Sequence, residues 1–203
     1  MAISTATILA TDLAESLAEP IKLESNYAVS RVDAFIPIFR ALGAIKGALH
    51  RLDIFTHASM PEHLATCPPD EQYAACRPVG AYGLIVGRKT LNLGRASMFQ
   101  LLNGAFSPMG IINLRACGVA GVIPDPKSKE GPSVWTGNGI KFCQAIADYA
   151  DCMVRASPDF QLYSITERTS FFGGVLSRTD YDPGAWEGSV FLFEPGKGYS
   201  VER

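Results

Sequence analysis

Residues 110–118 read Gly-Ile-Ile-Asn-Leu-Arg-Ala-Cys-Gly. Their aliphatic and β-branched side chains make residues 111–116 the strongest β-strand pattern in the chain, because such side chains suit a buried pleated surface. This run stops at Cys117, and a second short β-prone run, residues 52–56, stops in the same way at His57. Two predicted strands therefore each end at a residue whose side chain can do chemistry.

Helical patterns surround these two strands. Apolar residues recur at helical spacing from about Phe35, and we expect that helix to end near His50. Two further helices are predicted for residues 97–106 and 138–149, and another strand for residues 152–156. Helices that alternate with short strands are typical of βαβ units. The pattern predicts an α/β fold with a mostly parallel sheet sandwiched by helices.

The two ends of the chain have other patterns. Residues 1–29 give no clear signal apart from a weak helical stretch around residues 12–18. Residues 82–93 are rich in Gly, Val, Ile and Leu, which indicates a hairpin on the surface. Residues 161–203 are rich in Gly, aromatic and hydroxyl side chains and contain alternating segments, which favours antiparallel β-structure at one edge of the sheet. We expect all of residues 1–203 to form a single domain.

The overall composition argues against several classes of function. The chain has 203 residues, 47% of them hydrophobic, which is enough for one sizeable core. Its net charge of −2 and its scattered basic residues argue against binding to nucleic acid. No long apolar stretch or signal-peptide pattern occurs, so we expect no membrane partner. The five cysteines, an odd number, favour a reduced, cytoplasmic protein.

His57 and Cys117 are residues that can act together in catalysis. In open α/β sheets the functional crevice lies beyond the carboxyl ends of the strands, which is where both residues are expected. A nearby imidazole raises the thiolate fraction of a cysteine, or protonates the leaving amine after the thiolate attacks. We therefore predict that strands 52–56 and 111–116 are parallel neighbours, with His57 and Cys117 at one edge of the sheet.

The ordered set of these pieces resembles the clan CD cysteine peptidases of the caspase–haemoglobinase fold, and it is nearest to CHAT and related bacterial domains. The likeness spans roughly residues 30–195. It includes a strand that leads into His57, and about 60 residues later a strand that leads into Ala-Cys-Gly at 116–118. It also includes Leu-Asn-Leu-Gly at 91–94 before a helix and Gly-Ala-Trp-Glu at 184–187 before the last strands.

The resemblance implies a role for each residue of the pair. It implies that Cys117 is the nucleophile, that His57 is the general acid and base, and that the backbone N–H groups of Ala58 and Cys117 form the oxyanion hole. It also implies a polypeptide substrate, and we expect that the chemistry needs neither a metal nor an organic cofactor. Relatives carry glycine where this chain has Ala58. If that position requires a positive φ, alanine is strained there and its N–H is misaimed.

Substrate contacts are expected from the neighbours of the pair, namely Ser59, Arg115 and Gly118. Arg115 and Asp151 are candidates to line a specificity pocket. By charge complementarity, a basic floor beneath Cys117 would select Asp or Glu, and an acidic floor would select Lys or Arg.

Two functions of different classes fit these observations. One is a cysteine endopeptidase, which is favoured because both the histidine and the cysteine are present. The other is a catalytically inactive caspase-like binding or assembly module, which is favoured by Ala58. A lone cysteine after a strand is more often a core residue, which is the alternative role for Cys117. Cys143 and Cys152 belong to the apolar faces of a predicted helix and a predicted strand, and we predict that both are core residues. Trp186 is predicted to serve packing.

Overall fold

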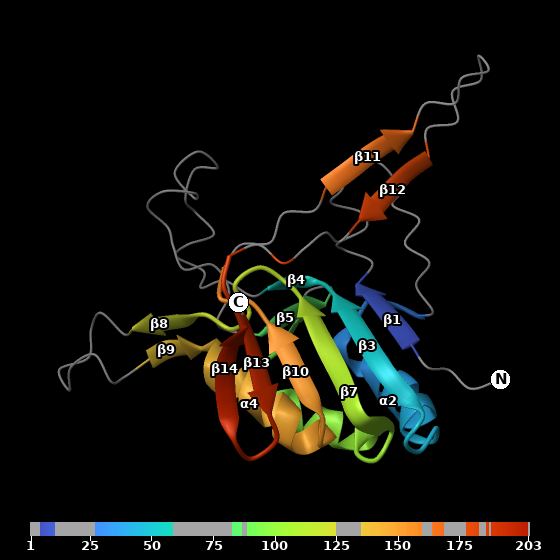
Figure 1. Ribbon diagram of the computed structural model, residues 1–203, viewed down its shortest axis with the longest axis vertical. Coiled ribbons are helices and arrows are strands. Elements are labelled where there is room, and N and C mark those ends of the chain that lie inside the picture. The colour runs from blue at the N-terminus through green and yellow to red at the C-terminus, as the bar shows by residue number, and fades with distance from the viewer. Residues whose placement is uncertain are drawn as a thin grey trace.

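A computed structural model of the chain describes residues 5–10, 27–58, 83–86, 89–124, 135–159, 164–168, 178–182, 186 and 188–202. Its main feature is a seven-stranded sheet with the order β14-β13-β10-β7-β3-β1-β2 (Figure 1). Strands β2, β1, β3, β7 and β10 are parallel, and β13 and β14 extend the sheet as an antiparallel pair. The strands are β1 Thr5–Ala10, β2 Tyr27–Val29, β3 Leu49–Phe55, β7 Phe106–Arg115, β10 Met153–Ala156, β13 Val190–Glu194 and β14 Gly198–Glu202. The predicted α/β class, mostly parallel sheet and antiparallel C-terminal region are confirmed.

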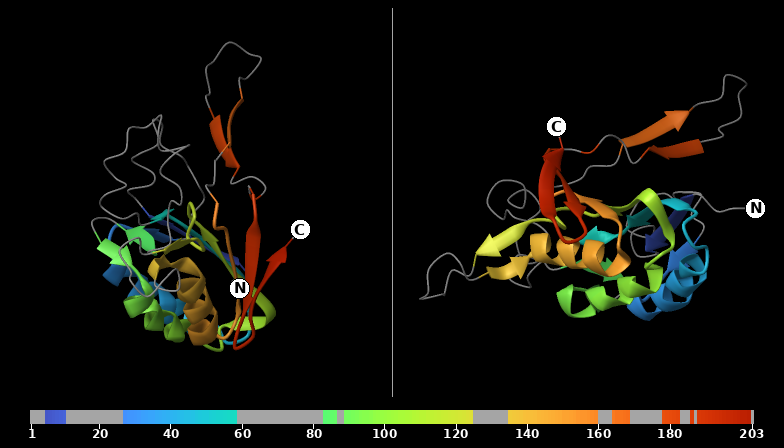
Figure 2. Two further views of the ribbon diagram at one scale, coloured as in Figure 1. Left: turned by 90° about the vertical axis from the view of Figure 1, so that its left-hand side faces the viewer. Right: turned by 60° about the horizontal axis from the view of Figure 1, so that its bottom comes forward.

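The helices described by the structure lie together on one face of this sheet, as the side views show (Figure 2). They are the short 3₁₀ turn η1 Val32–Ala34, the helix α2 Phe35–Gly43, the 3₁₀ segment η2 Leu93–Leu102 and the helix α4 Gly139–Ala150. We expected helices on both faces. Residues 12–18, for which a helix was also predicted, lie outside the described residues. Among the described helices none is long and apolar enough to cross a membrane.

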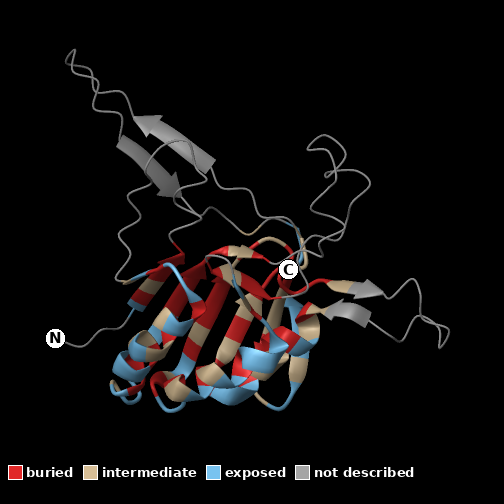
Figure 3. Cartoon of the chain, turned by 180° about the vertical axis from the view of Figure 1, so that it is seen from behind, coloured by how far each residue is buried: buried red, intermediate tan, exposed pale blue. Residues whose placement is uncertain are grey.

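The hydrophobic core lies between the sheet and these helices (Figure 3). Alternate side chains of the central strands point into it, and those that are fully buried include Leu52, Ile54, Ile112, Leu114 and Val154. The 3₁₀ segment η2 buries every third residue, at 96, 99 and 102, which matches its three residues per turn. At the start of α4, the side chain of Asn138 accepts a hydrogen bond from the N–H of Lys141 at 2.9 Å and so caps the helix.

The opposite face of the sheet carries a row of polar side chains. Asp53 and Asn113 occupy paired positions on β3 and β7, and the Asn113 amide donates to the Asp53 carboxylate at 2.7 Å. Arg51 forms an ion pair with the same carboxylate at 2.9 Å. Further along the row, Arg155 on β10 makes two hydrogen bonds to Glu202 on β14, at 2.6 and 2.8 Å. The row thus contains one ion pair at each end, Arg51 with Asp53 and Arg155 with Glu202.

Three predictions from the sequence need correction. Residues 5–10, which gave no clear pattern, form the buried strand β1 between β2 and β3. The helix from Phe35 ends at Gly43 rather than near His50, because Leu49 already donates its N–H to Ala105 O at 3.0 Å and so joins the sheet. His50 is therefore an exposed strand residue, and its Nδ1 lies 2.8 Å from Ser107 Oγ.

The third correction concerns the segments on either side of η2. The hairpin expected within residues 82–93 is present as β5 Leu84–Val86 and β6 Lys89–Leu91, but its apolar side chains are buried rather than at the surface. The helix expected to reach residue 106 stops at Leu102, and Phe106 begins β7. The remaining small strands are β4 His57–Ala58, β8 Val122–Pro124, β9 Trp135–Asn138, β11 Ser164–Arg168 and β12 Arg178–Asp182.

Candidate functional site

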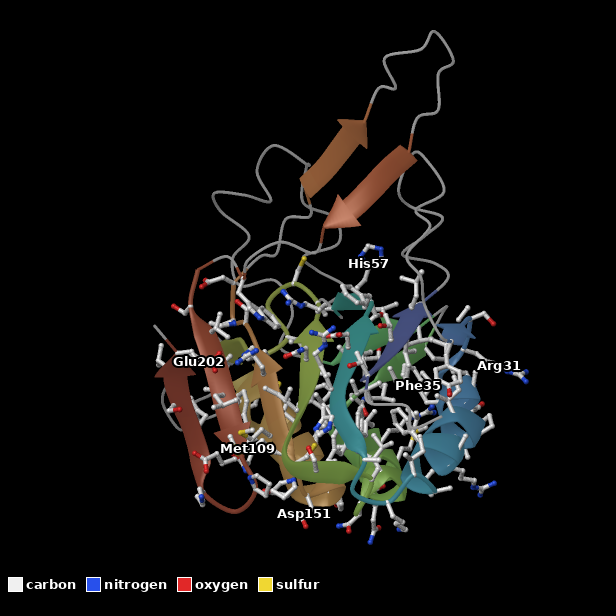
Figure 4. All side chains as sticks on the ribbon, turned by 45° about the vertical axis from the view of Figure 1, so that its right-hand side comes forward. Arg31, Phe35, His57, Met109, Asp151 and Glu202 are labelled. Carbon is white, nitrogen blue, oxygen red and sulfur yellow. The ribbon has the colours of Figure 1, made fainter. Side chains whose placement is uncertain are left out.

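The candidate site lies where two neighbouring parallel strands end. Phe55 of β3 and Arg115 of β7 form the last paired position of the two strands, and the N–H of Thr56 donates to Arg115 O at 3.3 Å. His57 and Cys117 each follow two residues later. Figure 4 shows His57 beyond this edge of the sheet. The prediction that the two strands are parallel neighbours is therefore confirmed, and their ends bring the backbone at His57 and Cys117 to the same edge.

His57 lies where the chain passes from the seven-stranded sheet into a small three-stranded sheet. Thr56 is buried, and its hydroxyl donates to Ile85 O, so the chain leaves β3 and joins the small sheet of β4, β5 and β6. His57 and Ala58 then pair with Ile85 and Leu84 in antiparallel register. The side chain of His57 is half-buried, whereas the flanking Thr56 and Ala58 are buried. The histidine ring is thus the partly accessible group of this short segment.

The strain expected at Ala58 does not arise. Among the described residues other than glycine, only Asp151 has a positive φ, of 52°. Ala58 lies in the extended strand β4 and is buried against the small sheet. An alanine is therefore compatible with the backbone at this position, and its presence gives no reason to expect a misaimed N–H.

Cys117 opens a tight turn at the same edge. Ala116 before it is fully buried, whereas Cys117 is half-buried. Gly118 has a φ of 61°, a conformation that costs most side chains roughly 1–2 kcal/mol, and its carbonyl accepts the N–H of Gly121 at 2.8 Å. The glycine therefore turns the chain directly after the cysteine. The N–H of Gly118 donates to Asp159 O at 2.7 Å, so this expected substrate contact is already engaged by the protein.

The other described cysteines belong to the core, as predicted. Cys143 on α4 and Cys152 before β10 are both buried. Burial raises the pKa of both thiols well above the ordinary value, and the charge of Asp151 adds to the rise of the Cys152 pKa. Thiols of this kind are inert because the thiolate is the reactive form. Cys117 is therefore the partly accessible thiol among the described cysteines.

A basic side chain lies next to this edge. Arg115 is half-buried, and its guanidinium carbon lies 4.0 Å from the centroid of the Trp186 ring. Trp186, which was predicted to serve packing, thus makes a cation–π contact with the last residue of β7. Asp151, the other candidate for a specificity pocket, precedes β10. It therefore lies at the amino ends of the parallel strands, far from His57 at their carboxyl ends (Figure 4). Ser59 lies outside the described residues.

Sequence reasoning missed two residues at this edge, Ser157 and Asp159. They follow β10, the third parallel strand to end here, and their backbone carbonyls accept the N–H groups of Ala120 and Gly118 at 3.0 and 2.7 Å. The available signal was the one used for His57 and Cys117, because Ser157 also comes directly after a predicted strand.

Neither a metal-binding group nor a comparison with known proteins assigns a function to this site. In the part of the chain that the structure describes, no group of three or more His, Cys, Asp or Glu side chains could hold a metal ion. No family profile matches the sequence, and searches of the curated proteins and of the solved structures find no match either.

Proposed function

We propose that this protein is a cysteine endopeptidase of the caspase–haemoglobinase type that uses Cys117 and His57. The observation that carries the proposal is the register of β3 and β7. His57 and Cys117 each lie two residues beyond the paired residues Phe55 and Arg115 of adjacent parallel strands. The half-buried state of both side chains, among buried neighbours, supports the same assignment.

In the proposed reaction the Cys117 thiolate attacks the carbonyl carbon of the scissile peptide bond. A C–S bond forms, and the electron pair of the C=O bond moves onto oxygen, toward the backbone N–H groups of Ala58 and Cys117. The His57 imidazolium gives its proton to the amide nitrogen as the C–N bond breaks. A water molecule then loses a proton to His57 and attacks the acyl carbon, which releases the acid and the Cys117 thiolate.

The charge of Arg115 favours an acidic residue in the substrate. Arg115 is the last residue of β7, and Cys117 opens the turn that follows two residues later, so the guanidinium lies close to the proposed nucleophile in the chain. A guanidinium pairs well with a carboxylate and poorly with another cation. We propose that the peptidase prefers Asp or Glu at the residue before the scissile bond.

Replacing Arg115 by glutamine tests this preference. We expect kcat/KM for peptides with Asp before the scissile bond to fall about 10- to 100-fold, because a hydrogen bond to a charged group contributes roughly 1.5–3 kcal/mol. The value for matched Asn peptides should change little. Arg51→Gln is the control. Arg51 on β3 pairs with Ile111 of β7 and so lies four residues before Phe55, which pairs with Arg115 next to the candidate site. Equal losses for Asp and Asn peptides would contradict the assignment.

The proposed function is tested by covalent trapping. The protein is treated at pH 7 with a peptidyl halomethyl ketone that carries Asp at its terminal position, and modification of all five cysteines is mapped by mass spectrometry. We expect stoichiometric modification of Cys117 that peptide substrate slows by competition. If Cys117 is modified no faster than other accessible thiols, the inactive binding module is the better account.

A further inference from the structure

The turn that contains Cys117 is tied to the segment after β10 by backbone hydrogen bonds. The N–H of Gly118 donates to Asp159 O at 2.7 Å, and the N–H of Ala120 donates to Ser157 O at 3.0 Å. The position of this turn therefore depends on where residues 157–159 lie.

Residues 157–159 are in turn fixed by the segment that leads into β13. The hydroxyl of Ser157, a fully buried residue, donates to Ser189 O at 2.8 Å and accepts the N–H of Asp159 at 2.9 Å. The Asp159 carboxylate accepts the N–H of Ser189 at 2.7 Å. We call Ser157, Asp159, Gly188 and Ser189 the tail clasp. Both backbone groups of Ser189 are bonded by it, so the clasp holds two segments that are about 30 residues apart in the chain.

Gly188 is required by the close approach within the tail clasp. Its φ is 69°, and a Cβ at this position would lie 2.8 Å from Asp159 Cγ and closer still to Oδ2. A side chain here would therefore push Asp159 away from Ser189. The same segment includes Trp186, two residues earlier, whose ring contacts Arg115.

We infer that Asp159 is a positioning residue for Cys117: through the tail clasp it sets the place of the turn that carries the thiol. This inference rests on the proposed function, in which Cys117 is the nucleophile. Nucleophile placement has a strong effect on rate, because a shift of about 1 Å can slow a reaction by roughly 100-fold. Opening the clasp should therefore change the rate of bond cleavage at Cys117 more than the binding of substrate.

The glycine pair Gly188 and Gly196 supplies a matched test. Gly196 has a φ of 68°, and a Cβ there would meet nothing within 4 Å. It lies in the turn between β13 and β14, at the opposite edge of the sheet from Cys117. Gly188→Ala and Gly196→Ala thus share the backbone strain, and we expect that strain alone to lower Tm by roughly 2–8 °C in each variant. Only Gly188→Ala also displaces Asp159.

Two readouts separate positioning from general loss of stability. We expect Gly188→Ala to lower kcat for peptide hydrolysis about 10- to 100-fold with little change in KM, and Gly196→Ala to leave both near the wild-type values. The hydrogen exchange of the Gly118 amide, followed by NMR, should become faster in Gly188→Ala than in Gly196→Ala. Asp159→Asn keeps an acceptor for Ser189 and should retain most activity, whereas Asp159→Ala should behave like Gly188→Ala.

The outcomes also separate this inference from the proposed function. Equal kcat values for Gly188→Ala and Gly196→Ala, in a protein whose wild type is active, overturn the positioning role alone. An inactive wild type overturns the proposed function, and the Gly118 exchange rate then decides the clasp by itself. Faster exchange in Gly188→Ala supports positioning of the turn, and unchanged exchange overturns it.

Discussion

The Cys117→Ala variant is expected to lose peptide hydrolysis by about 10³-fold or more, because the acyl-enzyme cannot form without the thiolate. His57→Ala is expected to lose about 10²- to 10⁴-fold, which is the usual contribution of a positioned acid and base. Both residues lie at the end of the sheet rather than in the core, so the variants should fold normally. The measurement is kcat/KM on a fluorogenic peptide with Asp before the scissile bond, at pH 7.

The double variant and a core cysteine complete this test. Cys117→Ala combined with His57→Ala should be no slower than Cys117→Ala alone, because the two side chains act as one unit. Cys143→Ala is the matched control, since it also removes a thiol but one that is buried on α4. It should lower the free energy of unfolding without changing kcat/KM per folded molecule. Full activity in Cys117→Ala would refute the assignment of the nucleophile.

The largest effect on stability is expected at Phe99. Its ring is fully buried in η2, and its centroid lies 4.8 Å from that of Phe39 in α2, so it joins two helical segments over the sheet. Phe99→Ala should lower the free energy of unfolding by about 3–5 kcal/mol, through lost burial and the cavity that remains. Phe99→Leu should cost less than half as much, because it fills most of that cavity.

Urea unfolding followed by circular dichroism measures this prediction. Leu93→Ala is the control within the same segment, since Leu93 is 49% exposed, and it should cost less than about 1 kcal/mol. Similar losses for Phe99→Ala and Leu93→Ala would contradict the described packing of η2 against α2.

The parts of the fold that were predicted from the sequence are those with a strong local pattern. The strand β7 and the helix α4 each have apolar residues at the spacing of their own element, so neighbouring residues suffice to indicate them. The strand β1 was missed because the polar residues Thr5 and Thr7 alternate with its buried apolar residues. They lower the average hydrophobicity of this stretch of sequence. The end of α2 was misplaced because pairing of Leu49 with the sheet, a contact distant in sequence, decides it.

The candidate site divides in the same way. His57 and Cys117 were predicted because each directly follows a predicted strand, and parallel strands end at the same edge. The tail clasp could not be predicted, because Asp159 and Ser189 become partners only through the pairing of β10 with β13. The contact between Arg115 and Trp186 depends on the same long-range arrangement. Local patterns therefore predict which residues reach the edge, and tertiary contacts decide how they are held.

The rate of Cys117 alkylation by iodoacetamide at pH 7 shows directly whether His57 activates Cys117. Wild-type protein and His57→Ala are compared, and modification at each cysteine is quantified by mass spectrometry over time. Cys143 and Cys152 serve as internal references for folding, because burial raises the pKa of both thiols and keeps them slow in folded protein. We expect Cys117 to react faster than every other cysteine and His57→Ala to slow its reaction about tenfold. Equal Cys117 rates in the two proteins, with Cys143 and Cys152 slow in both, would show that His57 does not activate the thiol.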